Sequence, residues 1–131
     1  MKIPFLDLQA AYLELESEIK EAINRVLSSG WYILGPEVEA FEQEFANYCQ
    51  AEHCVGVANG LDALILALRA MDVGEGDEVI VPSNTYIATW LAVSHCGAEP
   101  VPVEPDEKTY NIDHRLIESA ITKNTKAIIP V

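Results

Sequence analysis

The segment Val57-Ala58-Asn59-Gly60-Leu61-Asp62-Ala63-Leu64 decides the fold, because it runs from an apolar strand through a glycine turn into a helix. At the start of a helix several backbone N–H groups lack an intrahelical partner and point along the positive end of the helix dipole. Such a turn can hold an anionic group such as a phosphate. A simpler interpretation also stands, in which Asn59 caps the helix and Asp62 completes a weak capping box.

The length and composition predict one globular domain without a membrane span. Of the 131 residues 50% are hydrophobic, but no apolar run reaches the roughly 18 to 20 residues that a membrane helix needs. Pro4 and Asp7 interrupt the first apolar stretch, so a signal peptide is not expected. These features predict a cytoplasmic protein that does not bind membranes.

The charge balance is strongly acidic, with eight Lys and Arg residues against 21 Asp and Glu residues and a formal net charge of -13. Such a chain repels a phosphate backbone, so nucleic-acid binding is not expected. The cysteines Cys49, Cys54 and Cys96 suit a reducing compartment better than a disulfide framework. No second ligand pair stands at the spacing of a zinc site, so no metal site is predicted.

The first third of the sequence predicts two helices. Apolar residues recur at helical spacing from Tyr12 to Val26, and Ser28-Ser29-Gly30 ends this helix. Pro36 suits the first turn of the second helix. The face of the second helix that is predicted to be buried consists of Val38, Phe41, Phe45 and Tyr48. The apolar connector Trp31–Gly35 is expected to pack on this domain or on a partner subunit.

Strands alternate with helices in the remainder of the sequence. The predicted strands are Cys54–Val57, Glu78–Val81, Val101–Glu104 and Ala127–Val131, and the predicted helices are Leu61–Ala70, Tyr86–His95 and Asp113–Ile121. This alternation predicts an α/β fold with a mostly parallel sheet and helices on its faces, in which ligands bind beyond the carboxyl ends of the strands. The turns Asn59-Gly60 and Ser83-Asn84-Thr85 both follow strands, so we expect them at one edge of the sheet.

Four motifs resemble, in their order, a known family. They are Gly35-Pro36-Glu37-Val38-Glu39-Ala40-Phe41-Glu42, Asn59-Gly60-Leu61-Asp62-Ala63-Leu64, Gly76-Asp77-Glu78-Val79-Ile80-Val81-Pro82 and Thr109-Tyr110-Asn111-Ile112-Asp113. Together they are similar to the amino-terminal part of the DegT/DnrJ/StrS sugar-nucleotide aminotransferases, and the similarity covers essentially the whole chain. The resemblance implies the large domain of a fold-type-I enzyme that depends on pyridoxal 5'-phosphate (PLP), with helices on both faces of the sheet.

The resemblance also implies a reaction. Such enzymes move an amino group from a donor such as glutamate to a keto-sugar attached to a nucleotide, and they are homodimers when full length. The segment Ser83–Val93 is closest to members that aminate C-3 of a dTDP-linked 3-keto-6-deoxyhexose. Enzymes that act at C-4 and make perosamine-type sugars are the nearest alternative.

Cofactor-binding residues follow from the same resemblance. In family members the turn that corresponds to Gly60 and Leu61 donates backbone N–H groups to the phosphate of PLP. The family usually has Ser or Thr where this chain has Leu61, so a hydroxyl contact to the phosphate is absent here. An aromatic residue at the position of Tyr86 stacks on the pyridine ring of the cofactor.

Three residues are candidate substrate contacts, namely Tyr32, Asn84 and Thr85. In the family, the region around Tyr32 lies near the mouth of the active site at the dimer interface, so burial against a partner subunit is the alternative for this residue. For Asn84 and Thr85 the alternative is a role in capping the helix that follows.

No catalytic residue is expected within the chain. A transaminase needs a lysine amine that binds the cofactor and moves a proton, and none of the lysines falls in the Schiff-base motif of the family. The lysines are Lys2, Lys20, Lys108, Lys123 and Lys126. We therefore expect a truncated sheet and an inactive fragment. Residues 1–35 are predicted to form an amino-terminal helix with an interface and active-site loop, and residues 36–131 an incomplete PLP-binding α/β domain.

Two other functions stay open at this stage. A PLP-dependent sugar dehydratase of the same family has a His in place of the catalytic Lys. A non-catalytic module would use the Asn59-Gly60 turn to bind a nucleotide sugar or a phosphate without chemistry.

Overall fold

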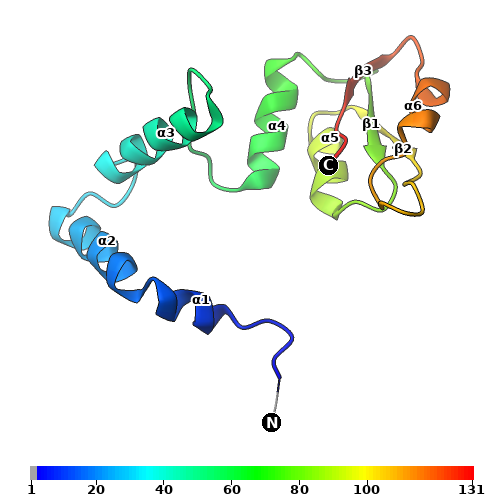
Figure 1. Cartoon of the computed structure of the whole chain (residues 1–131). Coiled ribbons are helices and arrows are strands. Elements are labelled where there is room, and N and C mark those ends of the chain that lie inside the picture. The colour runs from blue at the N-terminus through cyan, green and yellow to red at the C-terminus, as the bar shows by residue number, and fades with distance from the viewer. Residues whose placement is uncertain (1–2) are drawn as a thin grey trace. The chain divides into compact units, whose positions relative to one another are not determined.

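The computed structural model describes residues 3–131, and Lys2 lies outside them. The chain forms two compact units, one that ends at Gly56 and one that covers Val57–Val131 (Figure 1). None of the helices in the described residues combines the length and the apolarity needed to cross a bilayer.

The first unit consists of three helices, α1 (Leu8–Glu14), α2 (Glu16–Ser29) and α3 (Pro36–Cys49). The sequence predicted one helix where the structure has α1 and α2, because Leu15 leaves the helical conformation between them. Gly30 ends α2 with a φ of 68°, a left-handed conformation that glycine adopts at little steric cost. Pro36 begins α3, as predicted.

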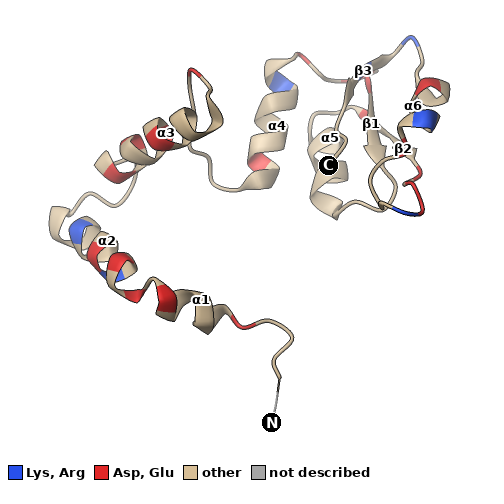
Figure 2. Ribbon diagram, in the orientation of Figure 1, with Lys and Arg blue, Asp and Glu red and all other residues tan. Residues whose placement is uncertain are grey.

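Acidic residues recur along α2 and α3 (Figure 2), and few apolar side chains of this unit are buried. The predicted buried face of α3 is wrong, because Phe41, Phe45 and Tyr48 are all exposed and Ala46 is the buried residue of the helix. The ring of Phe45 instead lies next to those of Phe41 and Tyr48 along the helix, with centroids 5.5 Å and 6.3 Å apart. Within the unit the connector Trp31–Leu34 is also exposed.

The predicted strand Cys54–Val57 is absent, and the backbone between α3 and the next helix is irregular. The N–H group of Gly56 donates to Oε1 of Glu42 at 2.6 Å. A strand forms only where a neighbouring backbone supplies partners for its N–H and C=O groups. Among the described residues no strand pairs with this segment, and a carboxylate side chain accepts the N–H of Gly56.

The second unit contains the predicted alternation of helices and strands. Its elements are α4 (Gly60–Ala70), β1 (Glu78–Pro82), α5 (Ile87–His95), β2 (Glu99–Val103), α6 (His114–Ala120) and β3 (Thr125–Ile128). Each lies within a few residues of its predicted position. Local signals account for this agreement, since Asn59 and Asp113 are the N-cap residues of α4 and α6.

The three strands form a parallel sheet in the order β2-β1-β3. From β1 the chain moves to β2, and it then crosses back to pair β3 with the other side of β1. Because parallel crossovers are right-handed, this reversal places α5 and α6 on opposite faces of the sheet. Figure 1 shows α4 and α5 on one side of β1 and α6 on the other. The predicted parallel sheet with helices on both faces is confirmed.

The core of the second unit surrounds the central strand. Val79, Ile80 and Val81 have no exposed surface, as expected for a parallel strand covered on both faces. Val79 and Val81 belong to one cluster with Leu68 of α4 and Val93 of α5, while the side chain of Ile80 points to the other face. This packing fixes α5 against the sheet and α4 against α5.

Candidate functional site

The start of α4 has two backbone amides without an acceptor. Oδ1 of Asn59 accepts the N–H of Asp62 at 3.0 Å, and the carbonyl oxygen of Asn59 accepts the N–H of Ala63 at 3.1 Å. The predicted capping role of Asn59 is therefore confirmed. Among the described residues no acceptor lies within reach of the N–H groups of Gly60 and Leu61. Two N–H donors at a helix N-terminus are available for an anion.

The surroundings of Gly60 suit a phosphate. A Cβ atom at this position would meet no atom within 4 Å, and the φ of Gly60 is not in the left-handed region. Neither packing nor backbone conformation in this structure requires a glycine there. A ligand that approaches the main chain closely is a physical reason for the missing side chain. The residues at this turn thus fit the phosphate group of PLP.

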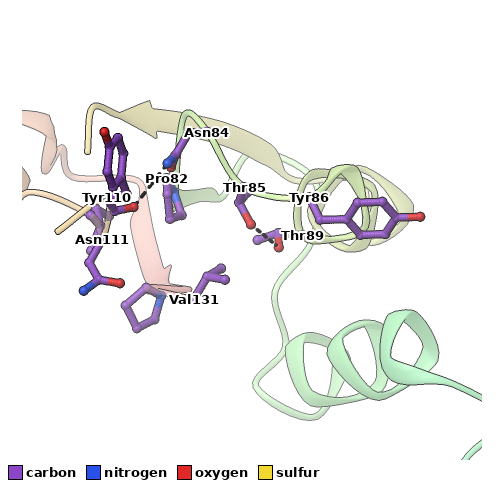
Figure 3. Close-up of a pocket in the computed structure, with 10 residues that line it drawn as sticks. Pro82, Asn84, Thr85, Tyr86, Thr89, Tyr110, Asn111 and Val131 are labelled. Carbon is purple, nitrogen blue, oxygen red and sulfur yellow. Dashed lines mark hydrogen bonds between the residues drawn. The ribbon is translucent and has the colours of Figure 1, made fainter. Parts of the chain in front are cut away.

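Tyr86 presents a free aromatic ring just before α5. Its backbone is the N-cap of the helix, but its side chain makes no capping bond and is 80% exposed. Figure 3 shows the ring pointing away from Asn84 and Tyr110. An exposed ring of this kind is available for stacking on a flat ligand.

The Gly60 turn and Tyr86 lie at the same end of the sheet. Helices α4 and α5 pack against each other, and in Figure 1 they run in the same direction. Both begin at the end of the sheet at which β1 finishes. The free amides and the exposed ring therefore share the edge where ligands of parallel α/β sheets bind.

A pocket of about 330 Å³ opens at this edge, between the carboxyl ends of β1 and β3 (Figure 3). Its lining comes from residues of three segments, 82–89, 110–112 and 130–131. The chain goes from β1 to β2 and then returns across the sheet to β3, so the strand order reverses at β1. Such a reversal of strand order is a common position for ligand sites in open α/β sheets.

Asn84 and Thr85 line this pocket, and both side chains have partners within the protein. Nδ2 of Asn84 donates to the carbonyl oxygen of Tyr110 at 3.1 Å, and the hydroxyl oxygens of Thr85 and Thr89 lie 3.1 Å apart (Figure 3). No side-chain capping bond is found at the start of α5. The two side chains thus connect parts of the pocket wall.

Tyr32 belongs to the first unit. The other predicted site residues belong to the second unit, namely Gly60, Leu61, Asn84, Thr85 and Tyr86. Tyr32 is 64% exposed, and its hydroxyl group donates to the carbonyl oxygen of Leu27 at 3.4 Å. Within its own unit, Tyr32 therefore has most of its surface free for a contact.

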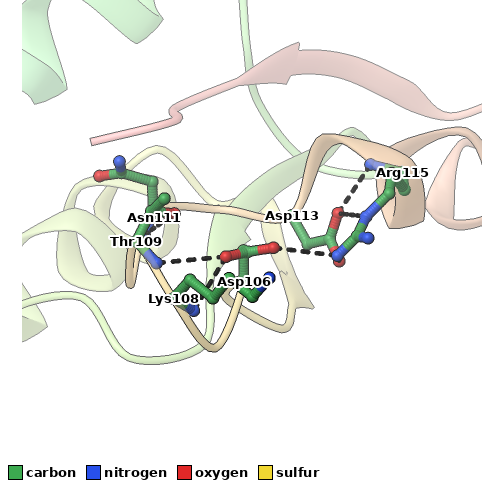
Figure 4. A network of polar contacts seen from close by, with 6 residues as sticks. All are labelled: Asp106, Lys108, Thr109, Asn111, Asp113 and Arg115. Carbon is green, nitrogen blue, oxygen red and sulfur yellow. Dashed lines mark hydrogen bonds and ion pairs between the residues drawn. The ribbon is translucent and has the colours of Figure 1, made fainter.

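An ion network stabilises the chain segment after β2 (Figure 4). Nη2 of Arg115 donates to Oδ2 of Asp113 at 2.8 Å and to Oδ2 of Asp106 at 3.0 Å. The Arg115 guanidinium lowers the pKa of Asp113 to about 2. Oδ1 of Asp106 accepts the N–H groups of Lys108 and Thr109. These two bonds hold the pKa of Asp106 below its usual value.

Tyr110 and Asn111 line the pocket, although the sequence pattern did not single them out as site residues. They belong to the motif Thr109–Asp113, which carried the family resemblance but no assigned role. That motif was the signal in the sequence that could have identified Tyr110 and Asn111 as site residues. Within residues 3–131 no group of three or more His, Cys, Asp or Glu side chains is arranged to hold a metal ion.

Comparison with known proteins identifies the family. Residues 13–131 match the model of the DegT/DnrJ/EryC1/StrS aminotransferase family. The chain belongs to this family, which confirms the resemblance seen in the four motifs.

Two curated relatives are 64% identical to the chain. One is the erythromycin biosynthesis sensory transduction protein EryC1 of Saccharopolyspora erythraea, aligned over all of this chain and 36% of that protein. The other is the dTDP-3-amino-3,6-dideoxy-alpha-D-galactopyranose transaminase of Aneurinibacillus thermoaerophilus, aligned over 98% of this chain and 36% of that protein. The chain thus spans about a third of the length of these relatives.

Solved structures share the fold. DesV of S. venezuelae, in complex with a ketimine intermediate, has a TM-score of 0.93 and 61% identity over 97% of this chain and 34% of its own. Spr1654 of Streptococcus pneumoniae was solved in PLP and PMP forms and has a TM-score of 0.82 and 43% identity over 88% of this chain and 29% of its own. The expected fold class is confirmed, and the cofactor of the family's aminotransferases is PLP.

Proposed function

We propose that the chain forms the amino-terminal part of a PLP-dependent aminotransferase that acts on a nucleotide-linked keto-deoxysugar, at C-3 of a dTDP-sugar. Glutamate is the proposed amino donor. The observation that carries this proposal is the shared sheet edge, at which the open amides of Gly60 and Leu61 and the exposed ring of Tyr86 both lie. The 64% identity with a transaminase named for a dTDP-3-amino sugar supports the substrate class.

In the proposed site each residue has a physical task. PLP, when bound, supplies an electron sink for amino-group transfer. The N–H groups of Gly60 and Leu61 would hold its phosphate, and the ring of Tyr86 would cover its pyridine face. Asn59 supports this arrangement, because its side chain takes up the N–H of Asp62 and leaves the two preceding amides open. Since position 61 has no hydroxyl group, the phosphate contacts from this turn are main-chain contacts only.

The proposed substrate contacts are Asn84 and Thr85 at the pocket and Tyr32 on the connector of the first unit. A pocket of about 330 Å³ is within the usual range for a small-molecule site. In the domain division that we propose, residues 1–35 provide the connector with Tyr32, and residues 36–131 provide the α/β part of the cofactor site.

We further propose a cytoplasmic homodimer for the full-length enzyme. The exposed apolar connector Trp31–Leu34 supports an interface, because contiguous apolar patches on a surface commonly mark association sites. The cysteines Cys49, Cys54 and Cys96 are free, which suits a reducing compartment.

The test is an assay of the full-length protein that contains this chain. The purified protein is expected to show the visible absorbance of bound PLP, and to convert a dTDP-linked 3-keto-6-deoxyhexose to its amino sugar when glutamate is added. The product is identified by mass spectrometry, with the corresponding 4-keto sugar as the control substrate. A product that has lost a hydroxyl group without gaining nitrogen would indicate a dehydratase. A colourless protein that binds the nucleotide sugar would indicate a binding module.

A further inference from the structure

The segment Pro105–Ile112, which follows β2, is a small closed loop. Its ends form an isolated antiparallel bridge between Pro105 and Ile112. Inside the loop the N–H of Asp106 donates to the carbonyl oxygen of Asn111 at 2.9 Å, and the N–H of Tyr110 donates to the carbonyl oxygen of Asp106 at 2.8 Å. The loop therefore has its own internal structure, and what needs explanation is how it is held in place against the pocket.

Tyr110, in this loop, has an unfavourable backbone conformation. Its φ is 59°, which lies in the left-handed region, and bulky side chains rarely adopt that region. A residue stays in such a conformation only when its surroundings hold it there, and such positions are frequent at functional sites. The ring of Tyr110 is 72% exposed, so burial of the ring is not the compensation.

The compensation comes from the hydrogen bonds of the Tyr110 main chain. The N–H of Tyr110 is bonded to Asp106, as described, and its carbonyl oxygen accepts Nδ2 of Asn84 at 3.1 Å. In the part of the chain that the structure describes, this is the one hydrogen bond between the loop Pro105–Ile112 and the segment that follows β1. Figure 3 shows the side chain of Asn84 reaching across to that carbonyl group.

The opposite side of the loop is held independently by Arg115. Its guanidinium contacts the carboxylate of Asp106 on the loop and that of Asp113 at the start of α6 (Figure 4). Oδ1 of Asp106 is itself bonded to the N–H groups of Lys108 and Thr109. This side is anchored to α6, and before the loop begins the N–H of Ser83 binds the carbonyl oxygen of Val103 at 2.9 Å. Asn84 supplies the direct bond between the loop itself and the segment that follows β1.

We propose that Asn84 is a positioning residue, whose side-chain amide holds the loop Pro105–Ile112 at the carboxyl end of β1 and thereby sets the wall of the substrate pocket. The inference rests on the proposed function for the identity of the ligand, but the attachment of the loop does not depend on it. The substrate contact proposed for Asn84 is compatible with this role, because the bond to Tyr110 uses one N–H of Nδ2 and leaves the second N–H and Oδ1 for a ligand.

Limited proteolysis of the full-length protein tests the attachment. Trypsin cleaves after Lys108, which is exposed within the loop, and cleavage reports the population in which the loop has opened. Asn84→Asp keeps the shape of the side chain but removes the N–H donor. Asn84→Leu also removes the N–H donor and adds no charge. Both variants should accelerate cleavage after Lys108 by roughly 2- to 10-fold, the ratio expected for one lost hydrogen bond.

Two controls make the result specific. Cleavage after Lys123, in the turn before β3, is the internal reference for general loosening and should not change. Thr85→Val alters the neighbouring residue of the same pocket but not the bond to the loop, so cleavage after Lys108 should stay at the wild-type rate. In steady-state kinetics, the Asn84 variants should raise KM for the keto-sugar, with kcat changed by less than about twofold, since only the wall of the pocket is altered.

Two outcomes overturn the proposal. Unchanged cleavage after Lys108 together with a raised KM would mean that Asn84 acts on the substrate by direct contact alone and does not hold the loop. Equal acceleration after Lys108 and Lys123 would mean that Asn84 stabilises the whole unit. If the wild-type protein lacks the absorbance of bound PLP, the proposed function fails, but the proteolysis still decides whether Asn84 holds the loop.

Discussion

Oδ1 of Asn59 accepts the N–H of Asp62 at 3.0 Å, and this bond determines which amides at the start of α4 remain open. The N–H of Ala63 is bonded to the carbonyl oxygen of Asn59, so Gly60 and Leu61 keep the two open donors. The cap and the anion site are therefore compatible. One residue stabilises the helix, and the two that follow it can face a ligand.

Replacing Gly60 should separate ligand binding from stability. A Cβ atom has free space in the protein, and Ala is a better helix former than Gly, so Gly60→Ala should leave stability unchanged or raise it by up to about 1 kcal/mol. A methyl group beside the open amides should weaken PLP binding by about tenfold or more, because bonds to charged groups are lost. The measurements are urea denaturation of the full-length apoprotein and PLP titration. Gly74→Ala, where a Cβ would meet only Cys96 at 3.8 Å, is the control and should bind PLP normally.

Tyr86 should affect cofactor binding and leave stability nearly unchanged. Because the ring is 80% exposed, Tyr86→Ala is expected to change the free energy of unfolding by less than about 0.5 kcal/mol. Loss of stacking should weaken PLP binding and shift the absorbance of the bound cofactor, whereas Tyr86→Phe keeps the ring and should preserve both. Equal PLP affinity in the Ala and Phe variants would contradict the stacking role.

The core position Leu68 should be sensitive to truncation. Its side chain is 2% exposed and packs in the cluster with Val79 and Val81, so Leu68→Ala should destabilise the protein by about 2 to 5 kcal/mol. Leu66 lies on the same helix but is 52% exposed, and Leu66→Ala is expected to cost much less. Urea denaturation of the two variants compares them, and similar losses would show that the packing of α4 described here is not correct.

Acid should weaken the contact between Asp113 and Arg115 in a defined range. The folded-state pKa of Asp113 is lowered from 3.8 to about 2 by its hydrogen bond with Arg115, so the carboxylate favours the folded state above about pH 4. That contribution is lost as the pH falls from about 4 to about 2. Asp113→Asn should therefore flatten the pH dependence of stability in this interval, as measured by thermal unfolding. Parallel curves for the variant and the wild type would contradict this assignment.

Much of the second unit could be predicted from the sequence, because its signals are local. Asn59 and Asp113 are caps within three residues of the amides that they bind, and strand β1 is an apolar run bounded by turns. In the first unit, likewise, Gly30 ends α2 and Pro36 begins α3 because of their own backbone preferences. Each of these features depends on neighbours in the sequence.

The sequence-based predictions that were wrong concern segments whose structure depends on residues far away in the sequence. Cys54–Val57 has the composition of a strand, but no neighbouring strand pairs with it, and a side chain of α3 takes the N–H of Gly56 instead. Phe41 and Tyr48 have the spacing of a buried helix face, yet both are exposed. Periodicity describes which side chains share a face, but burial requires something to cover that face.

The sequence by itself determined the family, the glycine turn at Gly60, the aromatic residue at Tyr86 and the succession of helices and strands. Only the tertiary structure decided the strand order, the pocket between β1 and β3, and the bond between Asn84 and Tyr110. Caps, turns and periodicity act over a few residues and can be recognised in a linear chain. A hydrogen bond between positions 26 residues apart exists only after the packing of β1 and β2 has brought their loops together.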